Sequence, residues 1–452
     1  MFGGLTGFGG RFAGAAFRQT VPTTIAGMLL DIEVLRMTEI VRLSACDLAA
    51  FPLSYRPTGL VPGLQPMEKD HEAGFETRAI HLGRDFVSDT GAVTPPVWLT
   101  STFEYGNPNG FDYTRSGNPN FRLLDRTVAS LEGAAYATCF GSGVSAITAV
   151  VSTLKSGDLV VAEENIYGCT FRLFAQVFAK FGVSVKYLDF TNPASLTTLA
   201  TLSPTLVWIE SPTNPNLKII DIAAVAEAAH AAGAPLIVDN TFASSYLQRP
   251  LELGADLSLL SLTKYANGHS DALAGAVCTN SEEWRDKMIF AQKALGLQPA
   301  PMDCWLTSRG LKTEAIRMER HCENALTFAR FLEDETGAVA VRYPFLPSHP
   351  QYELAKRQMS GGSGIVTVDF GLNLAETLAF VERLSLFPKA ESLGGVESLC
   401  CHPASMTHAS VPKETREAVG ITDSLVRFSV GIETVADLIA DVSRALPDSL
   451  KR

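Results

Sequence analysis

The sequence predicts an α/β fold, with parallel βαβ units in a large domain and a smaller domain after it. From about residue 130, short apolar segments alternate with helical stretches, which is typical of βαβ units. Of the 452 residues, 46% are hydrophobic and 19% are charged, so the chain can bury a large core. After about residue 316, helices and mixed strands follow one another. We therefore expect a disordered extension over 1–66, an N-terminal arm over 67–130, a large domain over 131–316 and a C-terminal domain over 317–452.

Five short apolar segments are the predicted strands of the large domain, at 158–162, 183–188, 205–209, 235–238 and 257–261. An alanine-rich helix is predicted over 221–233, because Asp221 and Gly233 favour the start and the end of a helix. The segment 364–370 is a predicted strand of the second domain. The uncharged run 133–154 is long enough to span a membrane, but its hydroxyl side chains and glycines favour a loop and a helix buried in a domain.

The charge balance argues against two classes of partner. Lysines and arginines number 37 and aspartates and glutamates 48, which gives a net charge of −11. A surface with this excess of acidic groups repels phosphate backbones and anionic lipids. We therefore expect neither nucleic-acid nor membrane binding.

The cysteines indicate a reducing compartment. The eight cysteines include no CxxC pair, so neither a disulfide framework nor a zinc ribbon is expected. Cys400, Cys401, His402 and His408 lack the usual spacing of metal ligands, and we expect no metal there. The first thirty residues hold no acidic side chain and only two arginines, a weak likeness to a transit peptide. A cytoplasmic location is expected, with organelle targeting by residues 1–66 as the alternative.

Charged and polar side chains come directly after three predicted strands. Glu210 follows the third strand and Asn214 lies in the turn beyond it, whereas Asp239 follows the fourth and Lys264 the fifth. Because ligands of open α/β sheets bind outside the carboxyl ends of the strands, these groups form a candidate site. Lys264 and Asp239 can be a structural ion pair. They can equally hold pyridoxal phosphate (PLP), with the amine forming a Schiff base and the carboxylate keeping the ring nitrogen protonated.

A glycine-rich turn can supply the phosphate-binding part of such a site. Gly141-Ser142-Gly143-Val144 can present backbone N–H groups where a helix begins. The hydroxyls of Ser261 and Thr263 can reach the same phosphate oxygens.

Two other functions use some of the same residues. The run from Gly141 to Ala146 matches the GxGxxA fingerprint of NAD-dependent dehydrogenases, with Glu163 in the place of the ribose-binding acid. A dehydrogenase gives no reason for Asp239 and Lys264, however. Ser261 and Lys264 match the SxxK motif of serine β-lactam enzymes, but the SDN and KTG motifs that accompany it are absent.

Longer motifs carry a resemblance to a known family. From Phe75 to Leu446 the chain resembles the Cys/Met-metabolism family of fold-type I PLP-dependent enzymes, which includes cystathionine γ-lyases, γ-synthases and β-lyases. The resemblance implies an aspartate aminotransferase-like fold whose large domain binds PLP. The matching motifs are Asp112-Tyr-Thr-Arg-Ser-Gly-Asn-Pro119, Glu210-Ser-Pro-Thr-Asn-Pro215, Val238-Asp-Asn-Thr-Phe242, Ser261-Leu-Thr-Lys-Tyr265, Glu391-Ser-Leu-Gly-Gly395 and Leu425-Val-Arg-Phe-Ser-Val-Gly-Ile-Glu433.

The resemblance implies a role for each matching residue. Lys264 would bind the PLP aldehyde, Asp239 the pyridine nitrogen and Asn214 the ring hydroxyl, while Tyr167 would stack on the ring and transfer protons. The implied phosphate cradle is Ser142, Gly143, Val144, Ser261 and Thr263, with Tyr113 and Arg115 reaching it from a neighbouring subunit. Arg427 would bind the substrate α-carboxylate, and Arg172, Glu391, Ser392 and Thr407 would lie beside it. A shared active site implies at least a homodimer, and the family usually forms tetramers.

The resemblance also implies an activity. Members that act at Cγ tend to have a glutamate where this chain has Glu391, whereas β-lyases tend to have an apolar residue. We therefore expect α,γ-elimination from L-cystathionine, giving L-cysteine, 2-oxobutanoate and ammonia. The alternatives are γ-replacement on an O-acyl-homoserine and β-lyase activity; the segments 299–304, 309–313 and 346–350 favour the γ-lyases. Asn120 and Cys169 depart from the family pattern without removing a catalytic group.

Overall fold

The computed structural model describes residues 73–82, 91–409 and 412–452. The predicted extension over 1–66 lies outside the described residues, as does part of the predicted arm over 67–130. Two sheets organise the described chain, one before and one after residue 316. The helix α10 (Glu314–Glu335) runs through the predicted boundary between the two domains, so the boundary itself stays a prediction.

A seven-stranded sheet forms the larger part, in the order β1-β7-β6-β5-β4-β2-β3. The strands β2 to β6 are parallel, and β7 is antiparallel to both β6 and β1. The carboxyl ends of β1 to β6 therefore meet at one edge of the sheet, the edge where ligands bind. The bounds are β1 (Tyr136–Phe140), β2 (Leu159–Glu163), β3 (Ser184–Leu188), β4 (Leu206–Glu210), β5 (Leu236–Asp239), β6 (Leu257–Leu260) and β7 (Gly275–Thr279).

Alternate residues of the central strands pack on opposite faces of this sheet. On β4, Trp208 packs into a core that includes α3, whereas Val207 and Ile209 pack into a core that includes α6. Both faces are buried, which explains the continuous apolar runs of the parallel strands. The helices of this part are α1 (Phe75–His81), α2 (Pro119–Glu132), α3 (Gly143–Val151), α4 (Gly168–Arg172), α5 (Pro193–Ala200), α6 (Ile222–Ala231), α7 (Ser244–Leu247), α8 (Glu282–Leu295) and α9 (Pro301–Leu311).

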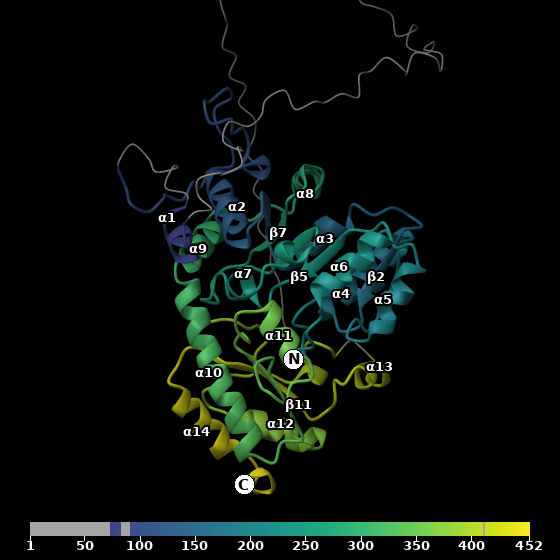
Figure 1. Ribbon diagram of the computed structural model, residues 1–452. Coiled ribbons are helices and arrows are strands. Elements are labelled where there is room, and N and C mark those ends of the chain that lie inside the picture. Colours follow the sequence, from purple (N-terminus) through teal and green to yellow (C-terminus); the bar gives the residue numbers. More distant parts are fainter. Residues whose placement is uncertain (1–72, 83–90, 410–411) are drawn as a thin grey trace, which may run out of the picture. The chain divides into compact units, whose positions relative to one another are not determined.

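A four-stranded antiparallel sheet follows, in the order β10-β11-β9-β8. Phe428 of β11, Phe328 of α10 and Leu438 of α14 share its core. Figure 1 shows the long α10 extending to this sheet, with α14 beside it. The bounds are β8 (Ala340–Arg342), β9 (Ile365–Asp369), β10 (Leu399–Cys401), β11 (Leu425–Ser429), α11 (Tyr352–Gln358), α12 (Leu374–Arg383), α13 (Lys413–Ala418) and α14 (Val435–Ala445).

The five predicted strands of the large domain are confirmed to within one residue at each end, as β2 to β6. The predicted helix is α6, with Asp221 accepting a hydrogen bond from the Ala224 N–H at 3.1 Å as its N-cap. The prediction for 133–154 is partly wrong, because the run holds β1 as well as α3. β1 lies at the edge of the sheet, and its first two residues are half-buried whereas its last three are buried. Its sequence therefore lacks the alternation of apolar and polar residues that identifies a strand with one exposed face.

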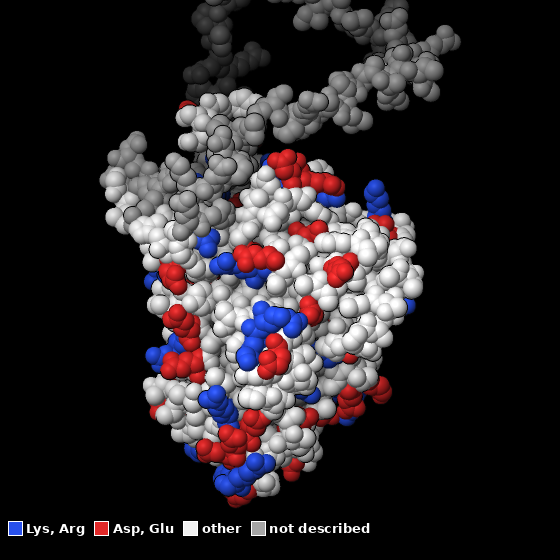
Figure 2. Space-filling view, in the orientation of Figure 1, with Lys and Arg blue, Asp and Glu red and all other residues white. Residues whose placement is uncertain are grey.

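The described surface shows mixed charge. On the face drawn in Figure 2, basic and acidic side chains lie among one another rather than in one broad basic patch. None of the helices in the described residues has the length and apolar character needed to cross a bilayer.

Candidate active site

Three strand ends bring charged groups to one edge of the large sheet. Glu210 and Asp239 are the last residues of β4 and β5, and they are paired in register. Lys264 lies in the turn after β6, where the Gly268 N–H donates to the Lys264 carbonyl oxygen at 2.8 Å. The sheet topology thus places these three residues together, as expected for strand ends of a parallel sheet.

Asp239 is a buried carboxyl group with one close neighbour that donates to it. Its side chain is 9% exposed, and the Thr241 N–H donates to its Oδ1 at 3.0 Å. Burial raises the pKa of Asp239, while hydrogen bonds from Thr241 lower it. Beside it, burial and then the charge of Asp239 raise the pKa of Glu210 well above its usual range. A cation next to Asp239 would therefore stabilise its ionised form.

Lys264 does not provide that cation. Its Nζ donates to Ser392 Oγ at 2.9 Å, and no ion pair joins it to Asp239 among the described residues. Burial, and then the Arg427 guanidinium, lower the pKa of Lys264 to about 8. The structural ion pair considered from the sequence is therefore wrong, and the lowered pKa leaves a larger fraction of this amine uncharged near neutral pH than in an ordinary lysine.

Arg427 lies on β11 of the small sheet and reaches the same site. It is 3% exposed; its Nη1 donates to Asn214 Oδ1 and its Nη2 to the Ser392 carbonyl oxygen, both at 2.9 Å. Its Nε has no hydrogen-bond partner in the described structure. A buried guanidinium with an unused donor is suited to bind a carboxylate.

Glu391 and Cys169 lie near enough to both Tyr167 and Lys264 to affect their pKa values. Burial, and then a side-chain hydrogen bond with Cys169, raise the pKa of Tyr167. Arg172, at the end of α4, donates from Nη2 to Cys169 Sγ at 2.7 Å. Glu391 is exposed, yet its charge raises the pKa of both Tyr167 and Lys264. The exposed carboxylate therefore lies at the opening of the same site.

Thr407 is held against α4 by a close backbone approach. A Cβ added to Gly168 would lie 2.6 Å from the Thr407 carbonyl oxygen, so a larger residue does not fit there. The Thr407 hydroxyl shares a hydrogen bond with His408 Nδ1 at 2.9 Å. Burial, followed by Arg427 and Arg172, lowers the pKa of His408 to about 4. From the sequence, the segment with His408 was expected to be a packed or substrate-adjacent loop rather than a metal site, but the effect of two arginines on this histidine was not predicted.

The start of α3 lies at the same edge and can bind an anion. The Ser142 hydroxyl caps the helix by accepting from the Ser145 N–H at 3.0 Å. The first N–H groups of a helix have no partner within it, so those of Gly143 and Val144 can bind a phosphate.

Ser261 closes this cradle from the side of β6. A Cβ added to Gly143 would lie 2.8 Å from the Ser261 Cβ, so glycine lets the helix start approach Ser261. The Thr263 hydroxyl donates to the Ala274 carbonyl oxygen at 3.2 Å, which fixes the turn that carries Lys264.

Tyr113 and Arg115 lie together on the arm. The Arg115 guanidinium is 5.5 Å from the centre of the Tyr113 ring, and its Nη1 donates to the Lys293 carbonyl oxygen on α8 at 2.9 Å. Both side chains are exposed. The role that the sequence resemblance implies for them, contact with the phosphate of a neighbouring subunit, stays a prediction.

The structure contradicts the dehydrogenase alternative. The glycine turn follows β1, which is an edge strand antiparallel to β7 rather than a central strand of a βαβ unit. Glu163 is buried and accepts from the Phe190 N–H at 2.9 Å, so it does not offer its carboxylate to a ribose.

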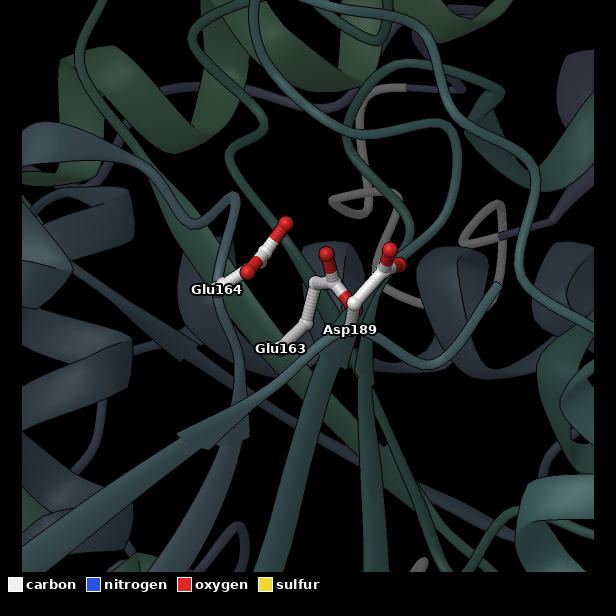
Figure 3. Close-up of side chains that lie close together, drawn as sticks. All are labelled: Glu163, Glu164 and Asp189. Carbon is white, nitrogen blue, oxygen red and sulfur yellow. The ribbon is translucent and has the colours of Figure 1, made fainter. Parts of the chain in front are cut away.

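Glu163 belongs to an acidic cluster with Glu164 and Asp189 at the ends of β2 and β3. Figure 3 shows the three carboxylates pointing toward one another. The Lys218 Nζ lies 2.8 Å from Glu164 and 3.2 Å from Asp189. Lys218 therefore compensates part of the negative charge of this cluster.

The residues of the site fit PLP. The buried Asp239 needs a cation beside it, the start of α3 offers free N–H groups, and the Lys264 amine has a lowered pKa. Ser142, Gly143, Val144 and Ser261 would hold the phosphate, and Asp239 and Asn214 the ring. Arg427 keeps an unused donor for the carboxylate of an amino-acid substrate.

Comparisons with known proteins agree with this chemistry. A sequence model of the Cys/Met metabolism PLP-dependent enzymes matches residues 76–447. The cystathionine gamma-lyase of Bos taurus is 47% identical over 395 residues, which are 86% of this chain and 96% of that protein. The cystathionine beta-lyase of Coxiella burnetii is 44% identical over 377 residues, 82% of this chain and 97% of that protein. A structure of cystathionine gamma synthase from Xanthomonas oryzae in complex with cystathionine superposes with a TM-score of 0.80, at 43% identity over 82% of this chain and 97% of that one.

Proposed function

This chain belongs to the Cys/Met metabolism PLP-dependent enzyme family, and on that premise we propose that it cleaves L-cystathionine by α,γ-elimination. The products are L-cysteine, 2-oxobutanoate and ammonia. The observation that carries the proposal is the 47% identity with a cystathionine gamma-lyase over almost the whole length of that protein. PLP, when bound, acts as an electron sink for the charge that develops at the substrate Cα.

Lys264 is the general base in this proposal. Its pKa of about 8 leaves part of the amine uncharged near neutral pH, so Nζ can take the proton from the substrate Cα. Ser392 holds Nζ at 2.9 Å and so limits where the amine can point. Asp239, at the end of β5, would hold the ring nitrogen of PLP and favour its protonated form.

Arg427, Tyr167 and Glu391 act on the substrate. The planar guanidinium of Arg427 binds the α-carboxylate, with Arg172 and Thr407 beside it. The Tyr167 hydroxyl, whose pKa is raised by burial, holds a proton that it can give to the departing sulfur. Glu391, exposed at the opening, lies beside the part of the substrate that extends from Cγ.

A homo-oligomer completes the site in this proposal, as a dimer or a dimer of dimers. Tyr113 and Arg115 reach the phosphate of the neighbouring subunit. Large apolar side chains are exposed on the arm, on the turn after Lys264 and on the nearby helices, as a contact surface between subunits requires. They include Leu99, Tyr105, Leu273, Phe290 and Ile316, which are 58% to 97% exposed. The proposed location is the cytoplasm.

Two related activities are tested in the same experiment. The second candidate is γ-replacement, because the chain is similar to a structure of cystathionine gamma synthase. The third candidate is β-lyase activity, because the chain is also similar to the cystathionine beta-lyase of Coxiella burnetii. The purified protein is given cystathionine, and the keto acid and the thiol are identified. 2-Oxobutanoate with cysteine supports the proposal, whereas pyruvate with homocysteine identifies a β-lyase. Consumption of cysteine together with an O-acyl-homoserine, at a higher kcat/KM than cystathionine cleavage, identifies a γ-synthase.

A further inference from the structure

Thr241 connects the two ends of the candidate cofactor site. It lies two residues after Asp239, and its N–H donates to Asp239 Oδ1 at 3.0 Å. Its Oγ1 accepts a hydrogen bond from the Ser261 N–H at 2.8 Å. In the proposed site, Asp239 would bind the ring nitrogen of PLP, and Ser261 would bind its phosphate. One residue thus contacts both groups, the Asp239 carboxylate through its backbone N–H and Ser261 through its hydroxyl.

The register of the sheet explains this contact. Asp239 pairs with Leu259, and the Asn240 N–H donates to the Leu259 carbonyl oxygen at 2.8 Å. Continued for two more residues, this register would bring Thr241 opposite Ser261, but β5 and β6 end at 239 and 260. The Thr241 hydroxyl therefore accepts the hydrogen bond that a backbone carbonyl would accept if the two strands continued. This hydrogen bond thus extends the pairing of β5 and β6 to the point where the two segments separate, which is where ligands bind in open α/β sheets.

Ser261 is fixed from its other side by α3. The start of the helix packs against it so closely that a Cβ on Gly143 would lie 2.8 Å from the Ser261 Cβ. Thr241 is therefore the connection between the Asp239 carboxylate and the helix start that binds phosphate.

We propose that Thr241 is a positioning residue that sets the distance between the Asp239 carboxylate and the phosphate cradle. This inference rests on the PLP binding of the proposed function and gives a role to a residue outside the predicted site. The hydroxyl also acts on the charge of Asp239. Burial raises the pKa of this carboxyl, and the hydrogen bond from the Thr241 hydroxyl lowers it, which favours the ionised form that a protonated ring nitrogen needs.

The test compares Thr241→Val with Thr241→Ser. Valine keeps the shape and the backbone N–H but removes the hydroxyl, whereas serine keeps the hydroxyl. The apoenzyme is titrated with PLP and the Kd is measured by fluorescence. The valine variant is expected to raise the Kd roughly ten- to a hundredfold, because the Ser261 N–H loses its hydrogen-bond acceptor and the hydroxyl no longer stabilises the charge of Asp239. The serine variant is expected to stay within about threefold of the wild type.

A second ligand separates positioning from general loss of structure. Pyridoxal has the ring but no phosphate, so the ratio of its Kd to that of PLP measures what the cradle contributes once the ring is bound. If Thr241 aligns the two ends, the ratio falls in Thr241→Val and is kept in Thr241→Ser. An equal loss for both ligands, with an unchanged ratio, would overturn the proposal.

Matched controls make the remaining outcomes decisive. Thr127 on α2 is also buried, at 2% exposure, and its hydroxyl donates to the Leu123 carbonyl oxygen. Thr127→Val is expected to leave the Kd for PLP unchanged. If Thr241→Val is unfolded by circular dichroism, Thr241→Cys replaces it, and a Kd equal to that of the wild type contradicts the inference. A wild-type protein that binds no PLP contradicts the proposed function itself, whereas normal binding by both wild type and Thr241→Val contradicts only the role of Thr241.

Discussion

The Lys264 amine donates a hydrogen bond to the Ser392 hydroxyl at 2.9 Å, which joins the edge of the large sheet to the chain before β10. Ser392 also accepts from Arg427 through its carbonyl oxygen, at 2.9 Å. It adopts a φ of 151°, a conformation that side-chain-bearing residues rarely adopt. A strained residue thus contacts both the proposed base and the proposed carboxylate-binding group, so the two depend on one another for their positions.

Lys264→Ala should remove covalent cofactor binding. The wild-type protein is expected to be yellow after addition of PLP, and borohydride should fix a pyridoxyl group on the peptide that contains Lys264. The rate of attachment to the apoenzyme should rise with pH around a midpoint of about 8, because only the uncharged amine attacks the aldehyde.

The control is Lys287→Ala on the surface of α8, where the lysine pairs with Glu283. This variant should bind PLP as the wild type does. A pyridoxyl group on another lysine of the wild-type protein would contradict the assignment of Lys264.

Arg427→Lys should weaken substrate binding more than turnover. The ammonium group cannot make the two parallel hydrogen bonds of a guanidinium, and it also leaves Asn214 or the Ser392 carbonyl oxygen without a donor. We expect KM for cystathionine to rise roughly ten- to a hundredfold, with a smaller fall in kcat. Steady-state kinetics measure both. An unchanged KM would show that the α-carboxylate binds elsewhere, and Arg357→Lys, a surface change at an ion pair with Asp221, is the control.

Glu391→Leu tests the choice between γ and β chemistry. The exposed carboxylate lies close enough to Lys264 and Tyr167 for its charge to raise the pKa of both. Its removal should lower kcat for 2-oxobutanoate formation by about tenfold and increase the share of pyruvate. Both keto acids are quantified by chromatography. The same change at Glu397, which bonds to Ser270, is the control, and a product ratio equal in both variants contradicts a role for Glu391.

The sequence predicted the parallel core of the fold well and its antiparallel edge poorly. β2 to β6 are buried on both faces, and their apolar runs mark them clearly. β7 (Gly275–Thr279) is buried too, but its glycine and short apolar run resemble a loop, and it was not predicted. The strand-end rule found Asp239 and Lys264, because it depends only on where strands end. The same rule places Thr241 at this edge but gives it no role, because its contact with Ser261 depends on the register between β5 and β6, which no local pattern reveals.

Contacts across the two sheets were beyond sequence reasoning without the family resemblance. Arg427 lies more than two hundred residues from Asn214 in the chain, and only the packing of β11 against the turn after β4 brings them together. Cys169 departs from the family pattern, yet nothing in the sequence indicates that its sulfur accepts from Arg172.

The free energy of unfolding should depend on Glu132, a carboxyl group buried behind the cofactor site. It ends α2, is 0% exposed and accepts hydrogen bonds from the hydroxyls of Ser245 and Ser258. Burial raises its pKa from 4.5 to about 7. The folded state therefore binds this proton more tightly than the unfolded state does. Its contribution to stability is complete below pH 4.5 and is lost as the pH rises through about 7.

Glu132→Gln should remove this dependence, because glutamine stays uncharged at every pH. Between pH 5 and pH 8, the unfolding free energy of the variant relative to the wild type should rise by about 1 to 3 kcal/mol. Urea denaturation of the apoenzyme at the two pH values measures the difference, and other buried carboxyls with raised pKa values, such as Asp125 and Glu163, cancel because both proteins keep them. Glu227→Gln, at an exposed position on α6, should show no such change. A relative stability of Glu132→Gln that is the same at both pH values would mean that Glu132 ionises in the folded protein as it does in the unfolded chain.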